Sequence, residues 1–225
     1  MENRIAVVIA AYNEAKVIAD VVREVVARGH NVILIDDGSQ DGTPEIARAE
    51  GARVVVHPVN LGQGAALQTG IEVALADGAE FIVTYDADGQ HQAADIENLV
   101  AALKTHAADF ALGNRFMGGT VDMTGSRRLL LQAATAFTRL TTGLQITDTH
   151  NGLRAMTRRG AGHIRLRQNR IAHASEILHQ IAASNLKFVE VPVTITYSAY
   201  SRAKGQKLAD FLAILIDLFA RRLQR

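Results

Sequence analysis

Apolar runs that end in polar loops alternate with helical patterns along the first half of the chain. Ile5 to Ala10 is a continuous apolar run, and the valines and isoleucines between Val17 and Val26 recur at helical spacing. The same alternation continues through four further runs. They are Asn31 to Ile35, Ala52 to His57, Phe81 to Tyr85 and Asp109 to Leu112. Successive strand–helix units predict a mainly parallel, doubly wound α/β sheet.

The second half of the chain carries a different pattern. We expect a flexible stretch from Gly118-Gly119, a helix over Leu129 to Thr142 and another helix around Ala174 to Ser184. Phe188 to Tyr197 alternates apolar and polar residues, which predicts a half-buried strand, and we expect this strand to be antiparallel. No linker-like segment separates the halves, so one fold is expected to continue through both.

Composition narrows the class of protein. The 225 residues include 24 lysines and arginines and 23 acidic residues, so no overall charge favours nucleic acid as a partner. The absence of cysteine excludes a disulfide framework and thiolate metal sites, and it is typical of a reducing cytoplasm. No stretch reaches the roughly 18 apolar residues that a membrane-spanning helix needs. We therefore expect a cytoplasmic protein that is soluble or lies at the inner face of the membrane.

Two carboxylates separated by one residue follow the fourth strand. Asp86 and Asp88 stand at the carboxyl end of the run Phe81 to Tyr85, and Gly89 closes the turn. In an open α/β sheet this edge binds ligands, because loops and helix N-termini converge there. Residues two apart on an extended backbone point the same way, so the two carboxylates suit one Mg²⁺ or Mn²⁺. Taken alone, the motif is equally well explained as a polar turn.

Five polar loops are expected at this edge of the sheet. In chain order they are AAYNE, DDGSQDGT, NLGQGAA, DADGQH and GNR. In this order they resemble glycosyltransferase family 2, which has the GT-A fold, and within it the dolichol-phosphate mannosyltransferase-like branch that acts on polyprenyl phosphates. The resemblance covers about residues 4 to 207. It implies a nucleotide-sugar-binding half over residues 1–117 and an acceptor half over residues 118–207.

The activity that the resemblance implies is a metal-dependent, inverting transfer of a hexose. The donor would be a UDP- or GDP-sugar, and the acceptor a polyprenyl phosphate or a cell-envelope glycan. A divalent cation, Mg²⁺ or Mn²⁺, would neutralise the charge that grows on the leaving nucleoside diphosphate.

The resemblance also assigns the nucleotide contacts. Ala10, Tyr12 and Glu14 fall at the positions that clamp the base, although the family usually has proline where this chain has Ala10. Tyr12 can stack on a base, and Glu14 can accept a hydrogen bond from a base edge or a ribose hydroxyl. Ile35 and Asp37 fall where family members meet the base and ribose.

Around the acidic turn, the resemblance places Asp86, Ala87 and Asp88 against the sugar-diphosphate. Asp88 would be the principal metal ligand, and Asp86 would share the metal or reach the ribose. Gln90 falls near the metal or a donor phosphate. His91 is a further candidate metal ligand, although a lone histidine at a helix start is more often a cap or a surface residue.

Cationic residues are expected at the acceptor. Arg115 can donate two hydrogen bonds to a phosphate, and the resemblance makes it an acceptor-phosphate or diphosphate contact. Arg127 and Arg128 are candidates for the same site, although each alone is better explained as part of a solvated helix terminus. Asp148 begins the segment DTHNGLR, which is similar to the family's Asp-x-x-Ser-Gly-Phe-Arg with two substitutions. It is expected to orient the acceptor, or to act as a base if the acceptor is a hydroxyl.

The last part of the chain contains two further predicted features. Tyr200 to Lys207 resembles the mobile loop that closes over the donor, with Arg202 matching the family and Lys204 or Lys207 expected to reach the diphosphate. Leu208 to Arg225 is predicted to be an amphipathic helix with a basic end. A helix of this kind can lie at an anionic membrane surface. Packing against its own domain or against the second subunit of a homodimer explains the pattern equally well.

Two other classes of function compete with this one. Asp-x-Asp-Gly also begins haloacid dehalogenase-like phosphatases, but those carry Thr or Ser after the glycine, on their first strand, whereas Gln90 follows here. The other alternative is a non-catalytic nucleotide-sugar-binding module, which predicts donor binding without turnover.

Overall fold

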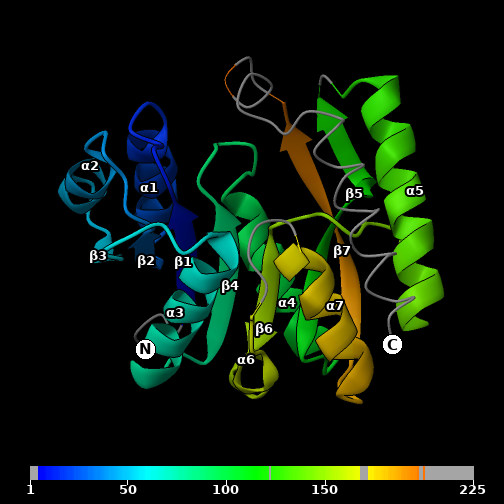
Figure 1. Cartoon of the computed structure of the whole chain (residues 1–225). Helices are drawn as coiled ribbons and strands as arrows, with labels where there is room; N and C mark the ends of the chain where they lie inside the picture. The colour runs from blue at the N-terminus through cyan, green and yellow to red at the C-terminus, as the bar shows by residue number, and fades with distance from the viewer. Residues whose placement is uncertain (1–4, 122, 168–171, 198–199, 201–225) are drawn as a thin grey trace.

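A seven-stranded sheet in the order β3-β2-β1-β4-β6-β5-β7 forms the centre of the described chain (Figure 1). The computed structural model describes residues 5–121, 123–167, 172–197 and 200. The strands are β1 (Ile5–Ala11), β2 (Asn31–Asp36), β3 (Arg53–Val56), β4 (Phe81–Asp86), β5 (Phe110–Val121), β6 (Arg154–Thr157) and β7 (Phe188–Thr196). The predicted loop 201–207 and the predicted helix 208–225 lie outside the described residues.

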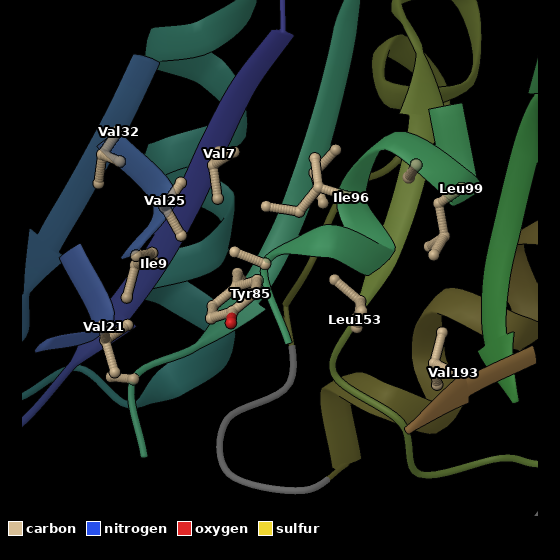
Figure 2. Packing of buried hydrophobic residues seen from close by; sticks show 14 of the residues in the cluster. Val7, Ile9, Val21, Val25, Val32, Tyr85, Ile96, Leu99, Leu153 and Val193 are labelled. Carbon is tan, nitrogen blue, oxygen red and sulfur yellow. The ribbon is translucent and has the colours of Figure 1, made fainter. Parts of the chain in front are cut away.

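Helices cover both faces of this sheet. They are α1 (Ile18–Ala27), α2 (Thr43–Ala49), α3 (Gln63–Ala76), α4 (Ala94–Thr105), α5 (Gly125–Thr142), α6 (Arg158–His163) and α7 (Ala172–Ala183). One buried cluster packs α1 and α4 against the sheet, and Figure 2 shows Val21, Ile96, Ile9 and Tyr85 among its side chains. A second cluster packs α3, α6 and α7 against the opposite face. No described helix is long and apolar enough to cross a bilayer.

The direction of one strand, β7, differs from the sequence-based expectation, and another strand, β6, was not predicted. β1 pairs in parallel with β2 and β4, and β7 pairs in parallel with β5, so the prediction of an antiparallel strand over Phe188 to Tyr197 is wrong. The antiparallel strand is β6, which lies between β4 and β5. Alternation misled the prediction because β7 is an edge strand, and an edge strand alternates whichever way it runs. With four residues, β6 is too short to show a pattern.

β5 is longer than predicted and includes the glycines that were expected to be flexible. It runs past Asn114 and Arg115, so these residues lie inside the strand and not at its end. A Cβ on Gly118 would lie 2.2 Å from the carbonyl oxygen of Val193 in β7, and the strand register shifts between Asn114 and Gly119. These observations show that glycine is needed here for close strand approach.

The position of α3 depends on a close contact with β1. A Cβ on Gly70 would lie 2.2 Å from Cγ1 of Val8 and 3.2 Å from Cγ1 of Ile35, and both neighbours are fully buried. The helix can therefore approach the sheet closely only without a side chain at this position. Because α3 begins at the sheet edge where the loops converge, this contact also positions the loop before it.

Gly70→Ala is expected to lower the free energy of unfolding by about 1–3 kcal/mol, because the extra methyl overpacks a buried contact. Urea denaturation followed by circular dichroism measures this change. Gly162→Ala in α6 is the matched control, because no atom lies within 4 Å of its Cβ position. Equal stability of the two variants would contradict the close packing of α3 on β1.

Candidate functional site

A cavity of about 830 Å³ opens at the carboxyl ends of β1 and β4. Its volume suits a small-molecule ligand. Ten of the predicted site residues line it: Ala10, Tyr12, Glu14, Asp37, Asp86, Ala87, Asp88, Gln90, Arg115 and Arg127. The cavity lining does not include Ile35, Arg128 or Asp148. Arg202, Lys204 and Lys207 lie outside the described residues.

The pairing register of the strands places these loops at the same edge of the sheet. Ala10 of β1 pairs with Asp86 of β4, so the first loop and the acidic turn leave the sheet together. Thr84 pairs with Arg154 of β6, and its hydroxyl donates to the carbonyl of Gly152 at 2.7 Å. The antiparallel strand therefore delivers the segment before it, DTHNGLR, to the same edge as the parallel strands.

Asp86 is held from both sides. Nε2 of His91 lies 2.9 Å from Oδ2 of Asp86, and Nε2 of Gln63 lies 3.5 Å from its Oδ1. Burial acts to raise the pKa of Asp86, but the hydrogen bond and the charge of His91 outweigh it, so the pKa lies below its ordinary value. A Cβ on Gly152 would lie 2.1 Å from Oδ2 of Asp86. The carboxylate can occupy this place only because residue 152 is glycine.

Asp88 has the opposite electrostatic character. Burial and then the charge of Asp86 raise its pKa to about 6, although it accepts hydrogen bonds from the backbone and the side-chain amides of Gln90. The charge of Asp86 is the second cause of this shift after burial, and a divalent cation would relieve the repulsion between the two carboxylates. No group of three or more histidine, cysteine or acidic side chains among the described residues forms a metal site. Two carboxylates suit Mg²⁺ or Mn²⁺ when phosphates and water complete the shell.

His91 supports this turn, a role that the sequence did not reveal. Its ring packs edge-on to Tyr85, with centroids 5.3 Å apart, and its carbonyl accepts a hydrogen bond from the Tyr85 hydroxyl at 2.8 Å. Its ring nitrogen meets Asp86, so the residue is neither a helix cap nor a surface histidine. His91 thus orients a carboxylate, as outer-shell histidines do around metal sites.

The second loop supports the first loop. The backbone N–H of Asn13, which has φ of 54°, donates to the hydroxyl of Ser39 at 2.8 Å, and that of Glu14 donates to the hydroxyl of Thr43 at 2.8 Å. The carboxylate of Glu14 accepts a hydrogen bond from the Tyr200 hydroxyl at 2.8 Å. These contacts fix the backbone next to Tyr12, which is 43% exposed and so presents its ring for stacking.

Asp37 anchors a third loop. Its carboxylate accepts from the backbone N–H groups of Leu61 at 2.9 Å and Gly62 at 2.7 Å, and it lies 2.8 Å from Nδ1 of His57. It therefore fixes the loop NLGQGAA and the start of α3 while lining the cavity. The side chain of Ile35 lies in the second core cluster, so the predicted base contact could come only from its backbone.

Arg115 and Asp148 form a buried ion pair. Nε of Arg115 lies 2.7 Å from Oδ2 of Asp148, and the Asp148 side chain is 0% exposed. Arg115 also donates to the hydroxyl of Tyr197 at 2.9 Å and to the carbonyl of His150. Burial acts to lower the pKa of Arg115, but the charge of Asp148 outweighs it and the pKa is raised. Asp148 is therefore placed to orient Arg115. Its side chain does not line the cavity, so it does not face a ligand bound there.

Other cations complete this side of the cavity. Cζ of Arg127 lies 4.6 Å from the ring centroid of Tyr197, whereas Arg128 is exposed. Arg154 also lines the cavity, although it is not among the residues predicted for the site. Burial lowers its pKa to about 10, against the opposing charge of Asp86. Its place as the last residue of DTHNGLR was the signal that could have identified it.

Two histidines lie on the same side of the cavity as Arg154. His150 and His173 both line it. Burial, then the charges of Arg154 and Arg115, lower the pKa of His150 to about 4, so its imidazole is neutral at physiological pH. The cavity thus has carboxylates at the ends of β1, β2 and β4, and arginines from β5, α5 and β6. This arrangement can hold a metal-bound diphosphate next to a second anion.

Known proteins are similar to this chain in sequence. A model of glycosyl transferase family 2 matches residues 6–165. A protein of unknown role from Methanocaldococcus jannaschii is 34% identical over 227 residues, which cover 99% of this chain and 93% of the relative. The UDP-N-acetylglucosamine–dolichyl-phosphate N-acetylglucosaminyltransferase of Methanococcus voltae is 30% identical and covers 89% of both chains. Polyprenol monophosphomannose synthase of Mycolicibacterium smegmatis is 32% identical, covering 86% of this chain and 77% of its own.

Solved structures show the same fold. Glucosyl-3-phosphoglycerate synthase from Mycobacterium tuberculosis, in complex with Mn²⁺ and UDP-glucose, superposes with a TM-score of 0.75 at 21% identity. The match covers 98% of this chain and 78% of that one. The family match leaves the phosphatase alternative without support. The chain belongs to glycosyltransferase family 2, and its sheet is the GT-A fold that this membership implies.

Proposed function

We propose that this glycosyltransferase moves a hexose from a UDP- or GDP-sugar to a polyprenyl phosphate at the cytoplasmic face of a membrane. The observation that carries the proposal is the division of charge within one cavity, with Asp86 and Asp88 on one side and Arg115, Arg127 and Arg154 on the other. Two matched relatives, by their names, act on dolichyl phosphate and polyprenol. Their acceptors are lipids, which supports the placement at a membrane.

The donor would lie over the loops after β1, β2 and β4. Tyr12 presents an exposed ring to a base, and Glu14 and Asp37 offer carboxylate oxygens to ribose or base hydrogen-bond donors. Asp37 accepts two backbone hydrogen bonds already, so its position is fixed before the donor arrives. This preorganisation lowers the entropy that nucleotide binding would cost.

Asp86 and Asp88 would hold Mg²⁺ or Mn²⁺, with Gln90 and His91 keeping the two carboxylates in place. When bound, the cation supplies charge neutralisation to the departing nucleoside diphosphate. Fixed carboxylates need little reorganisation as that charge develops. A structural neighbour was crystallised with Mn²⁺ and UDP-glucose, which supports a divalent cation and a nucleotide sugar as the ligands.

Arg115 and Arg127 would hold the acceptor phosphate. A phosphate oxygen is ionised at neutral pH, so its attack on the anomeric carbon needs no general base. The ion pair between Asp148 and Arg115 agrees with this, because Asp148 is buried away from the cavity and orients the arginine. His150 is neutral, so it does not compete with the arginines for the phosphate charge.

The test is the release of nucleoside diphosphate from UDP- or GDP-sugars in the presence of Mn²⁺ and undecaprenyl phosphate in detergent. Release that requires both the lipid phosphate and the cation is the expected result. Donor binding without release would favour the non-catalytic nucleotide-sugar-binding module. Failure to bind any nucleotide sugar with Mn²⁺ would contradict the proposal entirely.

Asp88→Asn is expected to abolish the Mn²⁺-dependent rise in melting temperature that a nucleotide sugar produces, because a ligand that binds the folded state stabilises it more the more tightly it binds. Thermal-shift assays with UDP- and GDP-sugars, with and without Mn²⁺, measure the effect. Asp20→Asn is the control, since that side chain is 85% exposed on α1 and lies outside the cavity lining. A full Mn²⁺-dependent shift in Asp88→Asn would exclude Asp88 as a metal ligand.

Gly152→Ala is expected to displace the Asp86 carboxylate while leaving the fold intact, because the new methyl would meet the end of a side chain and not the backbone. We expect kcat/KM to fall about a hundredfold, the scale of a misplacement by about 1 Å. Gly162→Ala serves again as the control with an open Cβ position. Unchanged kcat/KM in Gly152→Ala would show that the position of Asp86 does not matter.

A further inference from the structure

Tyr197, which directly follows β7, contacts two of the three arginines that line the cavity, Arg115 and Arg127, in two different ways. Its hydroxyl accepts a hydrogen bond from Nη1 of Arg115 at 2.9 Å, and the face of its ring lies 4.6 Å from Cζ of Arg127. Tyr197 is itself 1% exposed, and its backbone N–H donates to the carbonyl of Val121 at 3.1 Å. A rigid, buried ring thus joins two cations that come from β5 and α5.

Arg115 keeps hydrogen-bond donors for a ligand. A guanidinium has five N–H groups, and three of those on Arg115 are taken by Asp148, by Tyr197 and by the carbonyl of His150. One N–H group on each terminal nitrogen has no partner within the described part of the chain. Two N–H donors on one guanidinium are enough for a phosphate to accept two hydrogen bonds from it.

Arg127 keeps its donors as well. Within the described residues its guanidinium makes no hydrogen bond or ion pair, and its contact is the ring face of Tyr197. A cation over an aromatic face is attracted by the ring quadrupole without using an N–H group. Tyr197 therefore holds Arg115 through its hydroxyl and Arg127 through its ring. These contacts use one N–H group of Arg115 and none of Arg127.

We infer that Tyr197 is the positioning residue that presents Arg115 and Arg127 together to the phosphate of the acceptor. This inference rests on the proposed function, because it assigns a role at the same acceptor site. Two cations near each other repel, and each arginine loses side-chain freedom when it is fixed in one rotamer. The contacts with Tyr197 fix both side chains when the protein folds. Phosphate binding then costs less conformational entropy.

The two contacts can be separated by substitution. Tyr197→Phe removes the hydrogen bond to Arg115 and retains the ring under Arg127. Tyr197→Leu removes both contacts. We expect Tyr197→Phe to weaken acceptor binding about tenfold, the scale of a lost hydrogen bond to a charged group. Tyr197→Leu should weaken it by about a further fivefold, the scale of a cation–π contact.

The probe is geranyl phosphate, a water-soluble prenyl monophosphate, and calorimetry measures its Kd without any donor. In an Arg127→Gln background, the difference between Tyr197→Leu and Tyr197→Phe should disappear, because the ring then has no cation to hold. The loss in Tyr197→Phe should persist in that background. Tyr85→Phe is the matched control: it removes a buried tyrosine hydroxyl on the donor side and should leave the Kd for geranyl phosphate unchanged.

Four results would overturn the inference. Unchanged affinity in both Tyr197 variants would show that neither contact matters, and a leucine-specific loss that survives Arg127→Gln would assign the ring a packing role only. If Tyr197→Leu does not fold, Tyr197→Phe decides the question alone, and an unchanged Kd in this variant rejects the role. Wild-type protein that binds no geranyl phosphate would instead contradict the proposed acceptor class, and this inference with it.

Discussion

Repulsion between two carboxylates at the end of β4 is the constraint on which the site depends. Burial, and then the charge of Asp86, raise the pKa of Asp88, whereas the hydrogen bond and the charge of His91 lower the pKa of Asp86 against its burial. The fold holds this unfavourable pair in place through a glycine at residue 152, a hydrogen bond from His91 and two from Gln90. Carboxyl groups with perturbed pKa values cluster at functional sites. In the proposed function the ligand would be a divalent cation, which would in turn attract a diphosphate.

The rest of the cavity provides the complementary charge. Burying the charge of Arg115 without a partner would cost free energy, and the ion pair with Asp148 offsets this cost. Glu190 of β7 in turn accepts hydrogen bonds from Asn114 at 2.8 Å and from the backbone of Thr147 at 2.7 Å, which fixes the segment that carries Asp148. The arginine is therefore positioned through a chain of contacts from the sheet itself. In the proposed function, metal, donor and acceptor would meet because strands β4 and β5 carry side chains of opposite charge at the same edge of the sheet.

The first half of the fold is predictable because each strand there is a buried apolar run followed by turn residues. That pattern alone is enough to place Asp86, Asp88 and the loops after β1 and β2 at one edge of the sheet. β6 and β7 are harder to predict, since four residues carry no period and an edge strand alternates in either direction. Contacts between distant segments leave no local pattern. No periodicity or spacing indicates that His91 holds Asp86 or that Asp148 is buried against Arg115.

The carboxylate pair can be tested directly by anomalous X-ray diffraction from crystals grown with Mn²⁺ and UDP. The account predicts one strong manganese peak within coordination distance of both Asp86 and Asp88, with phosphate oxygens of the nucleotide completing its shell. A nucleotide bound in the cavity with no manganese at these two side chains, or with manganese elsewhere, would contradict the account.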